Sequence, residues 1–189
     1  MKAVTDRRVQ KTRALLQEAL LDLIVEKGYE AVTVQDLSVR ANIGRSTFYF
    51  HYEDKEKLLL DCIDQLLSFL QEQKPGSDEV EGGGIRFRFS LAMLQHVQGH
   101  RKVYAAVVGK QGTAVLYHMK QMLQSIIEDE IRQWRGAGVL KELPDGVLVT
   151  YILGSFWTLL HWWMEQGTPY TAHQLDELFH DITVTGISA

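Results

Sequence analysis

The side chains best suited to chemistry lie between residues 33 and 58, where Arg45, Thr47, Tyr49 and His51 share one short stretch. A guanidinium group can form paired hydrogen bonds with guanine, and hydroxyl, phenol and imidazole groups can bind phosphate oxygens. These residue types therefore suit a DNA groove and its phosphates. The chemistry we expect is recognition of nucleic acid.

The elements that must position these side chains form a predicted helix-turn-helix. Thr33 is a good N-cap, so a short helix should cover about residues 34–41. Asn42-Ile43-Gly44 makes a tight turn, and a second short helix follows over residues 45–51. Two short helices joined by such a turn are typical of a DNA-binding motif whose second helix enters the major groove.

A longer helix should precede this pair and another should follow it. Apolar residues recur at helical spacing over about residues 7–27, and Lys27-Gly28 is a typical helix end. Asp54 should cap the next helix. The expected core residues of this small unit are Leu37, Ala41, Ile43 and Phe48.

Enzymatic and metal-binding sites have little support in the sequence. His96 and His100 stand four residues apart, a spacing that can hold a metal, but no nearby carboxylate or cysteine completes a ligand set. His173 and His180 are seven apart and weaker still. Since no phosphate-binding glycine loop or nucleophile motif is present either, we expect no enzyme, no cofactor and no metal.

The charge distribution permits DNA binding without establishing it. The formal net charge is −4. Residues 1–60 hold ten Lys and Arg against nine Asp and Glu, whereas residues 61–189 hold ten against fifteen. A local basic patch decides phosphate attraction, and the acidic remainder should weaken non-specific binding.

Composition favours a cytoplasmic protein without a membrane span. The single cysteine, Cys62, excludes an internal disulfide, and the N-terminus lacks the apolar run of a signal peptide. Residues 146–164 carry no formal charge and approach the length of a membrane helix, but four polar residues interrupt them. Asp145 and Glu165 flank this stretch, so we interpret it as a helix buried on two sides.

The remainder of the chain also reads as helical, so the predicted fold is all-α. Residues 73–84 form the clearest loop. Residues 85–91 alternate with the period of a strand, yet no partner strand is evident, and we expect a helix. Further helices are expected over about residues 113–135, 144–166 and 171–184.

We therefore predict an N-terminal helix-turn-helix domain over residues 1–52 and a helical bundle over residues 53–189. The helix over residues 144–166 is apolar all round, as expected for a helix packed on both a core and a partner. The last two helices should form the interface of a homodimer, because helix-turn-helix proteins of this kind read two half-sites.

Several motifs together resemble the tetracycline-repressor (TetR) family of bacterial transcription regulators. The motifs are Gly28-Tyr29, Thr33-Val-x-Asp-Leu-Ser, Ala41-Asn-Ile-Gly, Ser46-Thr-Phe-Tyr-x-His-Tyr and Asp54-Lys-x-Lys-Leu-Leu. They cover roughly the first third of the chain, and their fixed spacings make chance similarity improbable. One departure is Gly44, where family members often place a serine cap.

The resemblance implies a role for each matching position. Arg45 and Ser46 would face base edges, with Arg45 bound to a guanine, and Phe50 would lie against a thymine methyl group or a sugar. Five residues would hold phosphates: Thr33, Thr47, Tyr49, His51 and Lys55. The alternative is that Tyr49 is half core, that His51 caps a helix end, and that Arg45 and Lys55 are solvated charges.

An effector pocket between the middle helices is a further expectation. Its candidate lining is Met93, His96, Tyr104, Tyr117, Met119, Met122, Phe156, Trp157 and His161, although core packing is the favoured explanation for any single one of them. A repressor released from a palindromic operator by a small apolar effector is the function this implies.

The C-terminal half offers a second reading. Val103-Tyr-x-x-Val-Val-Gly and Trp162-Trp-x-x-x-Gly look like the subset of the family that includes an activator of dihydroxyacetone-kinase genes. This resemblance implies an activator or co-regulator controlled by a protein partner. A third reading is a binding module that does not contact DNA.

Overall fold

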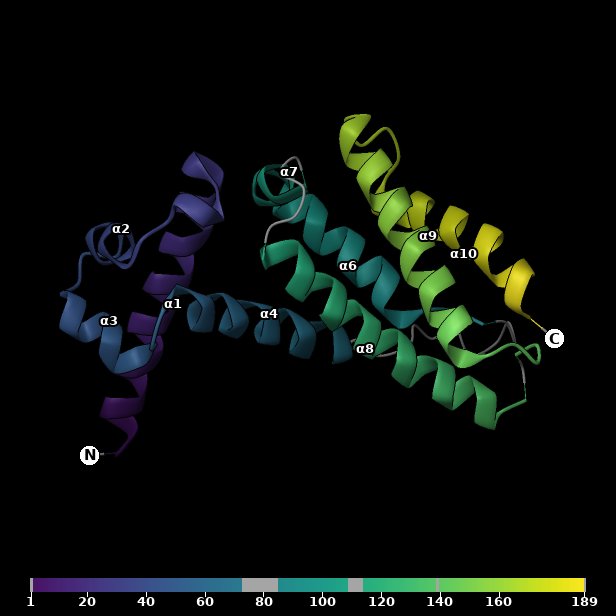
Figure 1. Ribbon diagram of the computed structural model, residues 1–189, viewed down its shortest axis with the longest axis horizontal. Helices are drawn as coiled ribbons and strands as arrows, with labels where there is room; N and C mark the ends of the chain where they lie inside the picture. The colour runs from purple at the N-terminus through teal and green to yellow at the C-terminus, as the bar shows by residue number, and fades with distance from the viewer. Residues whose placement is uncertain (1, 73–84, 109–113, 139, 189) are drawn as a thin grey trace. The chain divides into compact units, whose positions relative to one another are not determined.

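The structure is a computed structural model that describes residues 2–72, 85–108, 114–138 and 140–188. Two compact units divide the chain: unit 1 comprises Met1–Leu66 with Lys102–His118, and unit 2 comprises Leu67–Arg101 with Met119–Ala189. Within the described ranges the regular structure is helical, apart from an isolated antiparallel bridge between Leu140 and Ser188 (Figure 1). The predicted all-α fold is confirmed. The boundary predicted after residue 52 lies within unit 1 and stays a prediction.

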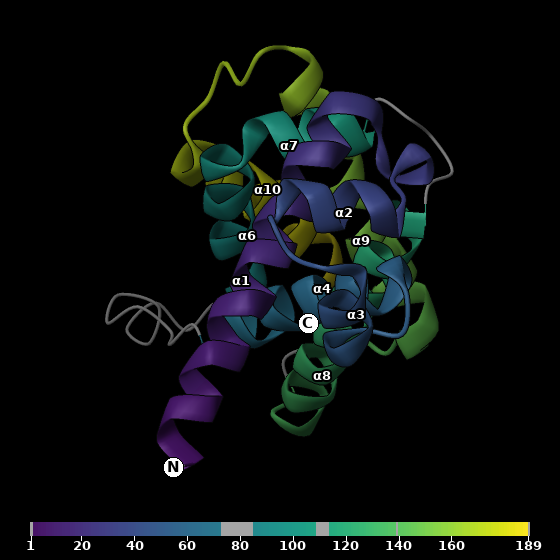
Figure 2. The same cartoon turned by 90° about the vertical axis from the view of Figure 1, so that its left-hand side faces the viewer.

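Unit 1 contains the predicted helix-turn-helix. Its long first helix is α1 (Lys2–Lys27), and the short 3-10 helix η1 (Tyr29–Ala31) leads into α2 (Val34–Arg40) and α3 (Arg45–His51). Figures 1 and 2 show α2 and α3 packed beside α1, in agreement with the contacts among these helices. The helix α4 (Lys55–Gln71) begins in this unit, as do most of α7 (Arg101–Val108) and the first turn of α8 (Ala114–Gly136).

The core of the helix-turn-helix follows the predicted apolar stripe. Leu16, Leu20 and Ile24 of α1 are buried, as are Leu37 of α2 and Phe48 of α3, and α1 contacts both of these helices. Ile43, predicted as core, is only half-buried because it lies in the turn between α2 and α3. Burial of these side chains is the main favourable contribution to docking α2 and α3 on α1.

Unit 2 is built around an aromatic core. It contains α6 (Arg88–Gly99), the remainder of α8, α9 (Asp145–Glu165) and α10 (Ala172–Ile187). Phe89, Phe156 and Phe179 are fully buried, and the Phe156 ring lies 5.0 Å from Phe89 and 5.3 Å from Phe179 between centroids. Aromatic side chains thus join α6, α9 and α10.

Several helix boundaries differ from the prediction. The first helix begins at Lys2 instead of residue 7. The sequence predicts a helix throughout residues 85–91, but α6 begins only at Arg88. Phe87 is its N-cap with an extended backbone, and the Phe87 N–H donates to His180 Nε2 at 2.8 Å. The loop predicted at residues 73–84 lies outside the described residues.

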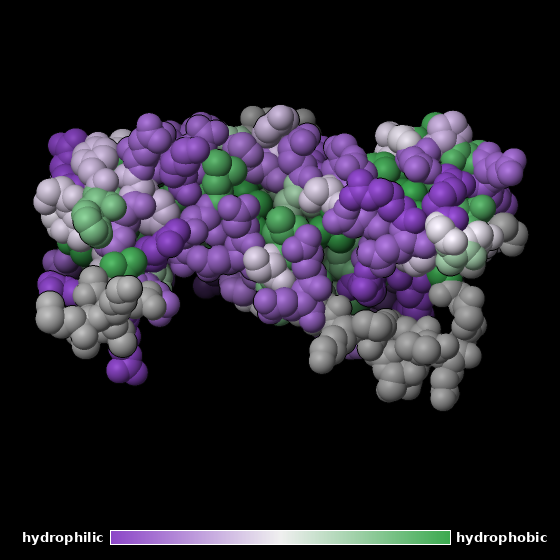
Figure 3. Space-filling view, turned by 90° about the horizontal axis from the view of Figure 1, so that it is seen from below, coloured by the Kyte–Doolittle hydropathy of each residue, from purple (hydrophilic) through white to green (hydrophobic). Residues whose placement is uncertain are grey.

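The helix α9 matches the uncharged stretch noted in the sequence. Among the described residues it is the one helix whose length and composition would also allow a membrane crossing. It buries Ile152, Phe156, Leu160 and Trp163 and contacts α10, as expected of a core helix. In Figure 3, hydrophilic side chains cover most of the visible face, with hydrophobic patches between them.

Candidate DNA-binding site

The exposed face of α3 carries four of the predicted DNA contacts. Arg45 and Ser46 in its first turn are exposed, as are Tyr49 and Phe50 in its second. Phe50 is 78% exposed, which is high for a phenylalanine and leaves its ring available for an apolar contact such as a thymine methyl group. The face therefore combines a cation, a hydroxyl, a phenol and an aromatic ring.

The opposite face of α3 fixes the helix to the unit. Phe48 is fully buried, and its ring lies 6.1 Å from that of Tyr52. At the other end, Gly44 occupies the N-cap position without a side-chain cap, and its carbonyl accepts hydrogen bonds from the N–H groups of Thr47 and Phe48. Asn42 takes a left-handed backbone conformation, with φ 52°, that completes the turn before α3.

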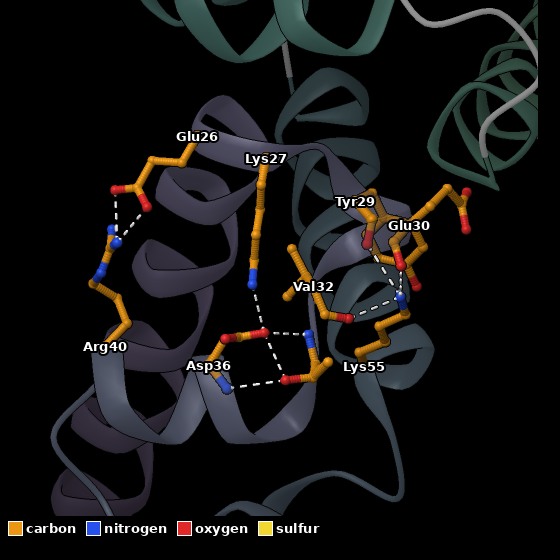
Figure 4. A network of polar contacts seen from close by, with 9 residues as sticks. Glu26, Lys27, Tyr29, Glu30, Val32, Asp36, Arg40 and Lys55 are labelled. Atoms are coloured by element: carbon orange, nitrogen blue, oxygen red, sulfur yellow. Dashed lines mark hydrogen bonds and ion pairs between the residues drawn. The ribbon is translucent and has the colours of Figure 1, made fainter.

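Thr33 lies at the start of α2 in a capping box with Asp36. The Thr33 hydroxyl accepts from the Asp36 N–H at 3.2 Å and donates to Asp36 Oδ2 at 2.6 Å, while the Thr33 N–H donates to the same oxygen at 2.8 Å. Lys27 Nζ at the end of α1 lies 2.6 Å from Asp36 Oδ2 (Figure 4). These bonds, led by Lys27, lower the pKa of the half-buried Asp36 carboxyl. The phosphate contact predicted for Thr33 must therefore compete with the capping box.

Lys55 is engaged within unit 1. Its Nζ donates to the carbonyl oxygens of Tyr29, Glu30 and Val32 at 3.1, 3.1 and 2.9 Å. It also lies 4.6 Å from the centre of the Tyr29 ring, and Figure 4 shows the ammonium group among these partners. Because an ammonium group has three N–H donors, the arrangement uses all of them. Lys55 thus joins α4 to η1, and the phosphate contact predicted for it stays a prediction that must compete with these bonds.

His51 and Thr47 are half-buried on α3. Burial, with a smaller contribution from the charge of Arg13, lowers the pKa of His51. The lowered pKa favours the neutral imidazole in the free protein, and a neutral ring can still donate one N–H to a phosphate oxygen. Both residues keep their predicted phosphate roles as predictions.

A polar cluster that no sequence motif predicts lies behind α3. Tyr52 donates from its hydroxyl to Asp61 Oδ2 on α4, and Arg13 on α1 donates to both the Tyr52 hydroxyl and Asp61 Oδ1, at 3.1 and 2.7 Å. Gln17 adds a bond of 2.9 Å to Asp61. Burial is the main cause that raises the pKa of Tyr52 to about 12. No short-range spacing links these residues, so only the fold reveals that they meet.

The residues of the predicted effector pocket are distributed over both units. Tyr104 and Tyr117 belong to unit 1, and Tyr117 is 62% exposed. Met93, Met119, Met122 and Phe156 of unit 2 are buried, while His96, Trp157 and His161 are half-buried. A groove of about 510 Å³ on unit 2 runs between α8 and α9; of the predicted residues, Trp157 lines it, beside Lys120, whose Nζ lies 5.1 Å from the Trp157 ring.

The histidines considered as metal ligands have other partners. The His96 and His100 rings stack at 4.3 Å, and burial lowers the pKa of His96 to about 4, followed by the effect of His100. His173 Nε2 lies 3.3 Å from Gln95 Nε2, and His180 is buried between Phe87 and Asp176. No cluster of three or more metal-binding side chains occurs in the part of the chain that the structure describes.

Comparison with known proteins identifies the two parts of the chain. Residues 16–62 match the model of the tetR family of bacterial regulatory proteins, and residues 87–184 match a transcriptional regulator C-terminal region of the same family. The HTH-type transcriptional regulator YhgD of Bacillus subtilis is 24% identical over 94% of this chain and 97% of its own length.

Two further similarities have different extents. YxbF of Bacillus subtilis, another HTH-type transcriptional regulator, is 48% identical over 61 residues, a match that spans 32% of this chain and only 16% of YxbF. The solved structure of a TetR transcriptional regulator from Streptococcus agalactiae has a TM-score of 0.72 and 28% identity, with 97% of this chain and 99% of that chain covered. The helix-turn-helix geometry and both family matches agree, and the chain belongs to the tetR family of bacterial transcriptional regulators.

Proposed function

We propose that this protein is a repressor that binds an inverted-repeat operator as a homodimer and leaves it when an effector binds. The exposed face of α3 is the observation that supports sequence-specific binding. Arg45 stands exposed at the start of the helix, where a guanidinium group can reach a guanine, and Phe50 presents its ring one turn further on.

An apolar surface on α9 and α10 supports the homodimer. Tyr151 and Trp162 on α9 are about two-fifths exposed, and Ile182 on α10 is 60% exposed, together with Val147 and Leu178. Exposed apolar side chains on neighbouring helices commonly mark a protein interface. Two copies joined through this surface would present two α3 helices to the two halves of a palindromic operator.

Release by an effector requires a change that reaches α3. The helix α4 has residues in both units, and the Lys55 and Asp61 contacts hold its first half to η1, α1 and Tyr52. A ligand that favours another position of α4 would therefore alter the separation of the two α3 helices in the dimer. Such a ligand acts by shifting the population of the operator-binding state.

Selection of bound DNA from a random pool tests the repressor proposal. Wild type should enrich an inverted repeat, whereas Arg45→Ala should weaken binding to the selected site by about ten-fold or more, the cost of one bidentate base contact. Arg132→Ala is the matched control because Arg132 is an exposed arginine on α8 of unit 2. Equal enrichment by wild type and Arg45→Ala would contradict the role of α3.

Control by a protein partner is the second candidate, and the packing of unit 2 favours it over a buried ligand. Phe156, a predicted pocket residue, packs its ring against Phe89 and Phe179, and Met93, another, is fully buried. Side chains that fill the core leave less room for an effector among them. If operator binding by the purified dimer changes with cell extract proteins and not with their small-molecule fraction, the protein-partner candidate replaces the small effector.

A further inference from the structure

We propose that the first turn of α8 is anchored to the helix-turn-helix by Glu30 and Glu56, so that α8 acts beside α4 in positioning α3. This inference rests on the proposed function, because it names a route by which a regulatory signal would reach the DNA-binding face. All four contacting residues belong to unit 1.

Glu30 supplies an acceptor for the N-terminus of α8. Its Oε1 lies 3.4 Å from the N–H of Ala114, the first residue of that helix. The first N–H groups of a helix have no partner within the helix, and the helix dipole places partial positive charge there. A carboxylate from η1 therefore stabilises the start of α8 both as a hydrogen-bond acceptor and as a negative charge.

Glu56 makes a second contact one turn further along α8. His118 Nε2 lies 3.3 Å from Glu56 Oε1, and the His118 side chain is only 19% exposed, against 58% for Glu56. Glu56 belongs to the first turn of α4. Ala114 and His118 are four residues apart and thus share one face of α8, which is the face held by both glutamates.

Lys55 connects the residues around Glu30 and Glu56 to the helix-turn-helix. Lys55, the residue before Glu56, donates from its Nζ to the carbonyl oxygen of Glu30. Glu30 therefore contacts α4 through its backbone and α8 through its side chain. Val32, another acceptor of Lys55, directly precedes the N-cap of α2. The contacts form a continuous chain from α8 through η1 and α4 to α2.

The continuity of α8 makes this anchor relevant to regulation. Residues 114–118 belong to unit 1 and Met119–Gly136 belong to unit 2, yet all lie on one helix. A helix transmits displacement along its length because its turns are held by successive hydrogen bonds. Any change in unit 2 that shifts α8 would therefore strain or release the contacts of Glu30 and Glu56.

Hydrogen exchange of the intact protein without DNA tests the anchor directly. In the Glu30→Gln/Glu56→Gln double variant, the amide of Ala114, which donates to Glu30, and the amide of His118, the first with an acceptor inside α8, should exchange about three-fold faster than in wild type, as expected for loss of weak contacts. His118→Gln removes the other partner of the Glu56 contact, and it should produce a smaller increase in the exchange rate of the same amides. Glu18→Gln is the control, since Glu18 is an exposed glutamate on α1 of the same unit. Unchanged exchange in the double variant would overturn the proposal.

A second readout separates positioning from simple stabilisation. Spin labels at Val39→Cys, an exposed site on α2, in a Cys62→Ser background report the distance between the two DNA-binding units of a dimer. The double variant should broaden the distance distribution while its unfolding temperature stays equal to that of Glu18→Gln. An equally narrow distribution would contradict a positioning role. Lack of any dipolar signal in wild type would instead contradict the homodimer, and hydrogen exchange, which needs neither dimer nor operator, would still decide the anchor.

Discussion

The Tyr52 hydroxyl donates a hydrogen bond of 2.5 Å to Asp61, and this contact joins the residue that ends α3 to the second turn of α4. Arg13 on α1 binds both partners, so three helices meet at one carboxylate. Tyr52 is 5% exposed, which means that water cannot readily replace a lost partner. The cluster thus holds the recognition helix against α1 and α4 from behind.

Replacement of Tyr52 by phenylalanine should destabilise the protein. The change removes the hydroxyl bond to Asp61 and leaves a half-buried carboxylate with one donor fewer, at an expected cost of about 1–2 kcal/mol in the free energy of unfolding. Urea unfolding followed by circular dichroism measures the loss. Tyr49→Phe is the matched control because Tyr49 is 52% exposed on the opposite face of α3. The two variants should differ; equal stability would mean that the Asp61 contact contributes nothing.

Lys55→Gln distinguishes the two roles considered for this lysine. Because its ammonium group already binds three carbonyl oxygens, we expect a loss of about 2 kcal/mol in unfolding free energy. The salt dependence of operator binding should stay unchanged, whereas removal of a phosphate ligand would reduce the slope of log affinity against log salt by about one. Lys57→Gln, two residues along α4 and exposed, serves as the control. A reduced slope with normal stability would restore the phosphate role.

The helix-turn-helix could be predicted closely because its signals are local. Thr33 and Asp36 are three residues apart, and Gly28 has a φ of 79° at the end of α1, so caps and turns could be read from short spacings. The exposed face of α3 followed from the same periodicity that buries Phe48. The boundary near Phe87 could not be predicted in this way, because the partner of the Phe87 N–H is His180, ninety-three residues away.

The polar partners of the site were hidden from the sequence for the same reason. Arg13 and Asp61 are forty-eight residues apart. Lys55 donates to backbone carbonyl groups, and the side chains of those residues give no indication of the contact. The three carbonyl partners of the Lys55 ammonium group depend on how the backbone folds, so no short spacing in the sequence predicts them. Burial of the predicted pocket residues was equally undetermined, since an apolar stripe fits a cavity wall and a filled core alike.

Two buried serines should respond to alanine in opposite ways. Ser38 on α2 is 2% exposed, and its hydroxyl has no hydrogen-bond partner among the described residues. Ser90 on α6 is fully buried and bonds to both the Phe87 carbonyl and the Asp176 carboxylate. Ser38→Ala should raise the unfolding free energy by about 1 kcal/mol, because it removes an unpaired polar group, whereas Ser90→Ala should lower it by about 1–3 kcal/mol. Chemical denaturation of both variants gives the comparison, and a destabilised Ser38→Ala would show that its hydroxyl has a bound water or another partner.

The buried carboxyl of Glu130 should make unit 2 less stable as the pH rises. Burial raises its pKa from 4.5 to about 7, against the opposing effect of Arg88 and of the backbone N–H groups of Arg88 and Phe89. Between these two pH values the folded chain binds more protons than the unfolded chain, so the free energy of unfolding falls as the pH increases through this window. The pKa of His96 is lowered to about 4, so His96 makes the free energy of unfolding rise with pH between pH 4 and 6.5. The pH profile of wild type alone therefore does not separate the contribution of Glu130 from that of His96.

Glu130→Gln removes the titrating group and keeps a hydrogen-bond acceptor near the Arg88 N–H, which lies 3.3 Å from the Glu130 carboxylate. The stability of this variant relative to wild type should therefore increase from pH 5 to pH 8, with most of the change below pH 7. Urea unfolding at four pH values measures the difference, and the contribution of His96 cancels because both proteins contain it. Glu128→Gln, on the same helix and more exposed, is the matched control. Parallel pH profiles for wild type and Glu130→Gln would show that the Glu130 carboxyl is ionised throughout this range and that its ion pair with Arg88 outweighs its burial.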